Sequence, residues 1–251
     1  MVYNQIQNWG YTMKTSFLLA TTCGLALAAG SAFAQGAPKN AVFTGIDATD
    51  DSYYLFAGWI HSFTDLDTSG PAVKLTLGGG EYDFNTAAGV PVNGDSFNTD
   101  LLVGYRFNTA EWQSGAFIGV SYKDSSQSVV VPSNQAVGDE TSFAIELELH
   151  HDGNQTNPVY VDLRGNYSDA FETYWTRGQL GYNFGSFVLG AETAFLGNED
   201  FDQQRYGAFG RVGISDTASI SLSVGFADFD TNVATNRSDG IYGQLGVSFA
   251  F

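Results

Sequence analysis

The side chains of this sequence best suited to act as a general base near neutral pH are three histidines, His61, His150 and His151. His61 adjoins Ser62, but neighbours on a strand point to opposite faces, so these two cannot form a nucleophile–base pair directly. His150 falls on the expected inward face of its strand, which predicts a hydrogen-bonded interior histidine. No serine is fixed near it by spacing. The sequence therefore predicts no catalytic residue, and a lipid-modifying enzyme stays an alternative.

Metal-ligating side chains show no recognised spacing. His150-His151-Asp152 are adjacent on one strand, where neighbours diverge, and no second His or Cys cluster completes a ligand set. The acidic pair Asp139-Glu140 and the segment 198–202 lack the spacing of a Ca²⁺ loop, so we expect solvated loop tips. Gly78-Gly79-Gly80 precedes no helix that would present amides to a phosphate, and is expected to relieve crowding or bend a strand. No metal and no cofactor are predicted.

The elements that would position these side chains are β-strands, because apolar and polar residues alternate along the chain. In the clearest run Leu222 and Val224 share one face, and Ser221 and Ser223 share the other. A soluble β-sandwich would show the same alternation, so this pattern alone does not place the chain in a membrane.

About twelve strands are expected, with ten as the smaller alternative. They are residues 42–47, 52–63, 72–84, 96–107, 112–124, 141–151, 158–167, 172–184, 187–197, 205–214, 218–229 and 240–251. The weakest is 42–47, kept because an even count places the short turns on the periplasmic side. Short turns are expected at 108–111, 152–157, 183–186 and 215–217. Longer polar loops are expected at 86–95, 125–140, 198–204 and 230–239.

Charged side chains fall on the polar face of their strands. An Arg or Lys facing lipid at mid-membrane costs about 2–4 kcal/mol, so a lipid-facing surface must exclude these residues. The charges expected in the lumen are Arg106, Glu146, Glu148, Asp162, Arg164, Arg177, Glu192 and Arg211. The aromatic residues expected there, as candidate glycan contacts, are Tyr82, Phe117, Tyr160, Trp175, Phe209 and Tyr242. Salt bridges that plug the bore, and a narrow path for an extended polymer, both stay open.

Composition and the N-terminal segment indicate a secreted chain. With 27 acidic and 10 basic side chains the surface repels nucleic acid, and 30 Gly with 20 Phe and 13 Tyr is not a disordered composition. Residues 13–34 have the pattern of a signal peptide that ends in Ala32-Phe33-Ala34. We expect residues 1–12 to be an upstream extension and 35–251 a single barrel domain. Cys23 lies inside the signal, so the mature chain would have no cysteine.

A short Gly-containing motif recurs at Val103–Phe107, Leu180–Phe184 and Leu245–Phe249, on strands that would descend toward the periplasm, where an aromatic girdle belongs. At the chain end, alternating apolar residues resemble the assembly signal of outer-membrane proteins, which implies recognition by the barrel-assembly machinery. These residues are Leu245, Val247, Phe249 and Phe251. Together the patterns predict a transmembrane antiparallel up-and-down β-barrel in the bacterial outer membrane.

Distinctive stretches lie at 56–59, 66–67 with Lys74, 78–82, 101–105 and 197–207. In them the sequence resembles the BcsS family, associated with cellulose biosynthesis, over roughly 42–251. The resemblance implies a non-enzymatic outer-membrane accessory of cellulose or exopolysaccharide biosynthesis and secretion. The expected partners are outer-membrane lipid and the assembly machinery, then cellulose or another glucan and other secretion subunits. The alternatives are a lipid-modifying enzyme and a sealed structural or adhesive barrel.

Overall fold

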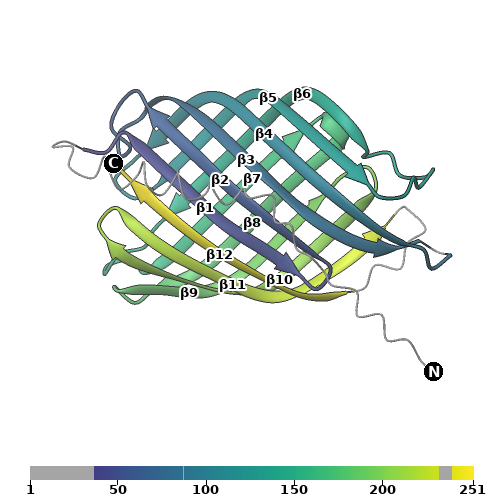
Figure 1. Cartoon of the computed structure of the whole chain (residues 1–251). Helices are drawn as coiled ribbons and strands as arrows, with labels where there is room; N and C mark the ends of the chain where they lie inside the picture. Colours follow the sequence, from purple (N-terminus) through teal and green to yellow (C-terminus); the bar gives the residue numbers. More distant parts are fainter. Residues whose placement is uncertain (1–36, 87, 232–238) are drawn as a thin grey trace.

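The structure, a computed structural model, describes residues 37–86, 88–231 and 239–251. In these residues the chain forms twelve antiparallel strands and one short 3₁₀ turn, η1. They are β1 (Asn40–Thr49), β2 (Ser52–Ser62), β3 (Gly70–Asn85), β4 (Pro91–Asn108), β5 (Gln113–Gln127), β6 (Gly138–His151), β7 (Val159–Ser168), η1 (Ala170–Glu172), β8 (Thr173–Asn183), β9 (Phe187–Gly197), β10 (Phe201–Ser215), β11 (Ala218–Thr231) and β12 (Gly240–Ala250). Each strand pairs with its sequence neighbours, and the sheet closes into a barrel (Figure 1). The predicted fold class and the strand count are confirmed.

The first and last strands close the wall. β1 pairs with β2 on one side and with β12 on the other, in a register that places Ala41 opposite Ala250. Figure 1 shows these two strands, purple and yellow, side by side. Phe251 completes the seam, because its amide donates to the carbonyl of Asn40 at 2.8 Å and its own carbonyl accepts from the Asn40 amide at 2.8 Å. The strand expected at 42–47 is therefore real and longer than predicted.

The two ends of the barrel are named here by Phe251. The C-terminal rim carries the turns 63–69, 109–112, 152–158, 184–186 and 216–217, and the distal rim carries the connections at the opposite end. The hairpins of β3 with β4 and of β5 with β6 reach beyond the distal end of β1 and β2 (Figure 1).

Three of the long loops expected at the distal rim are shorter than predicted, and the one expected at 125–140 spans 128–137. β4 already begins at Pro91 and β10 at Phe201, so the connections there are residues 86–90 and 198–200. Backbone hydrogen bonding between strands continues where both faces of a strand carry polar residues. The strands are therefore longer than the segments of hydrophobic alternation that predict them. Proline is accommodated as the first residue of a strand, where its missing N–H costs little.

The outer wall of the barrel is apolar. Side chains such as Val103, Leu147, Leu180 and Leu222 point outward and are more than half exposed. In a water-soluble protein this continuous apolar exterior would be unfavourable, whereas hydrocarbon accepts it. The alternation along β11 is thus inverted relative to a soluble barrel, with apolar residues out and serines in.

Aromatic residues form a belt near the C-terminal rim. The recurring motif places outward ring pairs there, Tyr105 with Phe107 at 4.7 Å and Tyr182 with Phe184 at 4.8 Å between ring centres. On β12 Phe249 stacks with Phe251 at 5.8 Å. Toward the distal rim a second set of outward rings includes the pairs Phe143–Tyr167 and Phe195–Tyr206. Two aromatic girdles around an aliphatic band are typical of transmembrane barrels.

Among the described residues, no helix is long and apolar enough to span a bilayer. The upstream extension expected at 1–12 and the signal peptide expected at 13–34, including Cys23, lie outside the described residues and stay predictions.

Candidate functional site in the bore

The part of the bore nearer the C-terminal rim is filled by side chains. One buried cluster comprises Ala72, Leu102, Phe117 and Ala144. Across the bore, a second comprises Tyr160, Val188 and Phe209. Charged residues occupy the level next to these clusters. The contacts of Lys74 with β6 and of Arg177 with β12 join strands that are not neighbours in the wall, so these side chains reach into the bore rather than lie along its lining.

Lys74 of β3 holds two glutamates of β6. Its ammonium contacts Glu146 and lies 2.5 Å from an oxygen of Glu148, although β4 and β5 separate the two strands in the wall. The Lys74 side chain is 3 % exposed. The rings of Phe43 and Phe117 lie 5.4 and 5.8 Å from the ammonium, which adds cation–π attraction. A buried lysine of this kind is stable only because its partners are charged.

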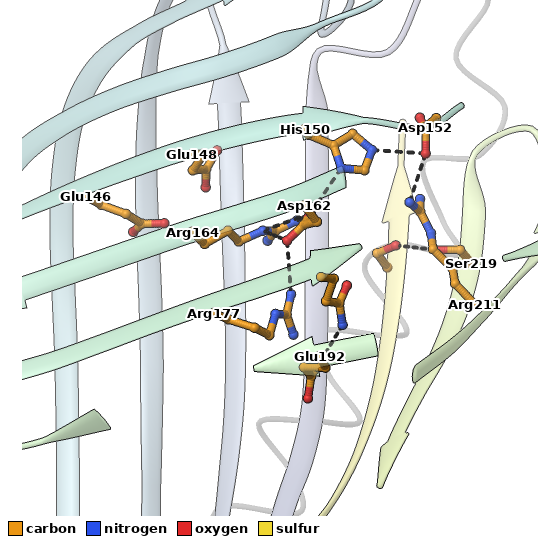
Figure 2. Close-up of polar contacts among 12 residues, drawn as sticks. Glu146, Glu148, His150, Asp152, Asp162, Arg164, Arg177, Glu192, Arg211 and Ser219 are labelled. Atoms are coloured by element: carbon orange, nitrogen blue, oxygen red, sulfur yellow. Dashed lines mark hydrogen bonds and ion pairs between the residues drawn. The ribbon is translucent and has the colours of Figure 1, made fainter. Parts of the chain in front are cut away.

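Asp162 of β7 is the centre of a second group (Figure 2). Its carboxylate lies 3.0 Å from the guanidinium of Arg164, 3.4 Å from that of Arg177 and 3.0 Å from Nδ1 of His150. The Asp162 side chain is 2 % exposed. Arg177 also donates to the side-chain oxygen of Gln244 at 3.1 Å, which extends the network to β12, separated from β8 by three strands of the wall.

The two groups adjoin each other, since Glu148 and Arg164 are directly paired across β6 and β7. Lysine and two arginines face two glutamates and one aspartate, so the formal charges of these six residues cancel. A cancelled, hydrogen-bonded set is the form in which charges tolerate burial. The structure thus supports the plug rather than the path at this level of the bore.

Glu192 of β9 is satisfied by neutral donors. It accepts hydrogen bonds from Gln179 at 2.5 Å, Ser223 at 2.9 Å and the hydroxyl of Tyr242 at 2.9 Å. Glu192 is buried in the bore, where it joins a hydrogen-bond network rather than an ion pair. Arg205, which was not among the predicted site residues, pairs with Asp47 at 2.6 Å. The alternation of residues along β10 already places Arg205 on the inward face of that strand.

Arg106 does not join the predicted lumen network. Its guanidinium donates to the backbone carbonyl of Leu66 at 2.6 Å, in the turn that links β2 to β3. Asn108 binds the same carbonyl at 2.9 Å. Parity placed Arg106 on the inward face correctly, but its position at the end of β4 brings it to a turn instead of to another charge. These two hydrogen bonds fasten the end of β4 to that turn.

The three histidines all lie near the C-terminal rim. His61 packs outside, against Trp59 at 5.8 Å between ring centres. Nδ1 of His151 lies 2.6 Å from the carbonyl oxygen of Val159, to which it donates in the tautomer that carries the proton on Nδ1. Only His150 faces the bore.

His150 is held between two carboxylates. Nδ1 contacts Asp162 and Nε2 lies 3.0 Å from Asp152, which also pairs with Arg211 at 3.0 Å. This hydrogen bond from His150, with the positive charges of His150 and Arg211, lowers the pKa of Asp152 despite its partial burial. Both ring nitrogens of His150 are thereby occupied by carboxylates, as expected for the predicted structural histidine. Arg211 also donates to Ser219 at 3.3 Å.

Above the charged level, the distal half of the bore opens into a cavity of about 480 Å³, called the cup here. Its floor includes Glu146, Arg164 and Arg177, so the plug closes it from below. Its volume is within the range of about 300–1,000 Å³ found for small-molecule sites.

The predicted aromatic lumen residues divide between the cup and the packed interior. Tyr82 and Trp175 line the cup. The other four are packed and almost fully buried: Phe117, Tyr160, Phe209 and Tyr242. Tyr160 lies edge-on to His150 and beside Phe209, at 5.4 Å between ring centres in each case, so no face of it is free for a sugar. A role as glycan contacts stays a prediction for Tyr82 and Trp175 and is withdrawn for the packed four.

One wall of the cup consists of polar residues that the sequence reading did not select. Tyr54 lies across Gly78, where any side chain would overlap its ring, and its hydroxyl donates to the side chain of Asn98. Gly78 therefore relieves crowding, as predicted. Beside them Asp100 and Lys123 also line the cup. Inward parity marks these residues, but only the folded barrel shows that they lie above the plug and not in it.

Two carboxylates connect segments of the distal rim to one another. Asp200 accepts from the amides of Gln135 and Ala136, both at 2.8 Å, and so fixes the loop 128–137 to the turn 198–200. Glu140 accepts from the amide of Phe171 in η1 at 3.0 Å. Phe171 has a φ of 53°, in the left-handed region that non-glycine residues rarely adopt.

The assembly-signal residues lie where parity placed them. Leu245 points outward on β12 and is 45 % exposed, and Phe249 and Phe251 belong to the C-terminal belt. Recognition by an assembly machinery stays a prediction.

Comparison with known proteins adds a family and a fold. The family model described as "Cellulose biosynthesis protein BcsS" matches residues 41–251. No curated protein is significantly similar to this sequence.

Among solved structures, the COG4313 outer membrane channel from Pseudomonas putida F1 has a TM-score of 0.52 at 11 % identity, covering 87 % of this chain and 97 % of that one. The β-domain of the Bordetella autotransporter BrkA has a TM-score of 0.51 at 11 % identity, covering 86 % and 100 %. At such identity the likeness concerns the fold alone.

Proposed function

This chain belongs to the family of cellulose biosynthesis protein BcsS, and we propose that it is a non-enzymatic outer-membrane accessory of cellulose biosynthesis and secretion. The single observation that carries the proposal is the family match over nearly the whole barrel. The closed wall with its apolar exterior and aromatic girdles supports the outer-membrane location, because such a surface is stable only in lipid.

The content of the bore favours binding over conduction. Buried clusters and six mutually neutralised charges occupy the bore between the cup and the C-terminal rim. A polymer would have to break these contacts to pass. We therefore place the role of this barrel at the distal surface, where it would hold or guide glucan that another subunit exports.

The placement of the histidines supports a non-enzymatic role. All three lie near the C-terminal rim, remote from the cup, and the hydrogen bonds of His150 go to carboxylates rather than to a nucleophile. A lipid-modifying site at the distal rim would lack a histidine base in the wall around it.

The test is a deletion of the gene in a cellulose-producing host, with extracellular glucan measured as glucose after acid hydrolysis. We expect less extracellular glucan, and recovery when the wild-type gene is restored. Unchanged glucan would reject the role. The lipid A of both strains is compared by mass spectrometry, and a mass change on deletion would favour the enzyme alternative. Fractionation of the membranes tests the location, because the heat-modifiable barrel should be in the outer-membrane fraction.

A further inference from the structure

Resting on the proposed function, we propose that the cup is a carbohydrate-binding site that takes the end of a neutral β-linked glucan or a short oligosaccharide of it. Asp100 and Asn98 would bind the hydroxyls, and the rings of Tyr82, Phe84 and Trp175 would pack against the sugar faces.

The first observation is an unused hydrogen-bond acceptor. Asp100 is 6 % exposed, yet it lines the cup. Its Oδ2 accepts from the hydroxyl of Thr76 at 3.1 Å, whereas its Oδ1 has no hydrogen-bond partner in the structure. A buried carboxylate oxygen without a donor is costly. Oδ1 itself is covered in this structure. Rotation of the carboxylate about its Cβ–Cγ bond would turn it toward the cup, where a sugar hydroxyl would supply the donor.

The second observation is the polar edge around Asp100. Asn98 and Lys123 are directly paired on β4 and β5, and Asp100 is the next inward residue along β4. The three side chains offer acceptors and donors from one wall of the cup. Hydroxyls that both donate and accept match such a mixed set.

The third observation is the aromatic surface. Tyr82 and Phe84 lie nearly parallel, with 9° between their rings and 6.2 Å between ring centres. From β8, Trp175 lines the same cavity and has the guanidinium of Arg177 5.5 Å from its ring. Flat aromatic rings pack against the apolar faces of sugar rings. The sugar hydroxyls, which lie around the edge of each ring, then remain free to bind Asn98, Asp100 and Lys123.

The charge balance selects a neutral ligand. The floor charges are already paired, Arg205 with Asp47 at 2.6 Å and Lys74 with Glu146. Asp100, which offers the free acceptor, is itself negative. Lys123 is the cation of the cup beside Asp100, and its formal charge balances that of Asp100. The side chains that line the cup carry five positive and six negative formal charges, so an acidic polysaccharide would meet no net positive charge and a neutral glucan is favoured over an anionic one.

The experiment measures binding to the purified, folded full-length barrel in detergent by calorimetry. The probe is cellohexaose, and the comparison ligands are maltohexaose and a hexamer of galacturonate. We expect cellohexaose to bind more tightly than the galacturonate hexamer by at least tenfold. Asp100→Asn and Trp175→Ala should each weaken cellohexaose binding by at least tenfold, since each removes one half of the site.

Matched controls carry the same changes outside the cup. Asp139→Asn lies on the outward face of β6 near the distal rim, and Trp112→Ala lies at the C-terminal rim against His151. Both should bind cellohexaose within twofold of wild type. Tyr82→Ala replaces Trp175→Ala if the latter does not show the heat-modifiable folded form.

Absence of cellohexaose binding by the folded wild-type barrel would overturn the site, as would binding unaffected by the cup variants. Tighter binding of the galacturonate hexamer would overturn the neutral class. If gene deletion lowers extracellular glucan but the barrel binds no glucan, the proposed function stands and this site does not. If the barrel binds but deletion has no effect, the reverse holds.

Discussion

At the scale of single residues, Lys74 keeps two glutamates together inside the bore. Lys74→Met retains most of its volume but leaves two buried carboxylates close together without their cation. Breaking a buried pair on one side costs about 3–5 kcal/mol. We expect the free energy of unfolding, measured by urea titration of the barrel in lipid vesicles, to fall by this amount. Lys39→Met is the control, because Lys39 is exposed and should change stability by less than about 0.5 kcal/mol. Equal effects of the two substitutions would contradict the network.

Asp152 gives a prediction on pH. Its pKa is lowered in the folded barrel, first by the hydrogen bond from His150 and then by the charges of His150 and Arg211. A lowered pKa means that the folded state favours the carboxylate. The stabilisation is present above the ordinary range near pH 4 and is lost as pH falls through the lower folded value.

We therefore expect wild type to unfold at higher urea than Asp152→Asn at pH 5, and the gap to shrink toward zero by pH 2. The side chain is 58 % exposed, so the gap should be below about 1 kcal/mol. Asp216→Asn, exposed at the same rim, should show no such gap at pH 5. A gap that widened on acidification would refute the sign.

The alternation of residues along each strand predicts which side chains face the bore, but it does not predict which of them contact each other. Asp162, Arg164 and Arg177 were predicted to face inward and do so, because alternation alone decides the face of a strand. Which of them meet depends on the stagger of strands across the bore, and no local pattern encodes that stagger. The sequence therefore predicts Tyr160 as a glycan contact although it is packed in the fold, and it does not distinguish Asp100 as a residue of the cup.

At the scale of elements, β11 separates a lipid face from an interior face residue by residue. Leu222 is 56 % exposed on the outside, whereas Ser221 points into the bore. Leu222→Arg should lower stability in lipid vesicles by about 2–4 kcal/mol, and Ser221→Arg by clearly less. Ser223 is unsuitable for this comparison, because it is 2 % exposed and donates to Glu192. Equal cost at both positions would argue against lipid around this strand.

The order of the loop 128–137 should depend on the carboxylate of Asp200, in the turn between β9 and β10 at the distal rim. Asp200→Ala removes both acceptors for the amides of Gln135 and Ala136. We expect elastase to cut this loop at least fivefold faster in the variant, because the loop contains valine and alanine and would lose its anchors. Asp216→Ala at the opposite rim is the control and should leave the cleavage rate unchanged. Slow, unchanged cleavage in Asp200→Ala would mean that packing alone holds the loop.

Element boundaries were predictable only as far as the apolar band extends. The even strand count predicts the strand at 42–47, although its own alternation is weak. Alternation does not predict the start of β4 at Pro91 or of β10 at Phe201, because these strands extend beyond the apolar band with polar side chains on both faces. Backbone hydrogen bonding there is identical to that inside the band, and sequence alternation does not report it.

At the scale of the whole molecule, the filled bore predicts an electrically silent barrel. The wild type, inserted in a planar bilayer, should show no steady ion conductance. The double substitution Lys74→Ala with Glu146→Ala removes a cancelling pair and empties volume at the floor of the cup. This variant should conduct more than wild type if it folds, and steady conductance by the wild type would overturn the plug.

The closure of the wall by its two ends also determines when the barrel can form. Asn40 and Phe251 are 211 positions apart in the chain, yet their backbones are hydrogen-bonded at the seam. Neighbouring strands can pair as hairpins at once, but the last pair must wait for the final residues and bear the loop-closure entropy of almost the whole domain. Until then β1 and β12 are two unpaired edges, which invite pairing with other chains. The time between synthesis and closure is thus the period of greatest aggregation risk, and a holding chaperone that shields strand edges should raise the yield of folded barrel more than one that speeds hairpin formation.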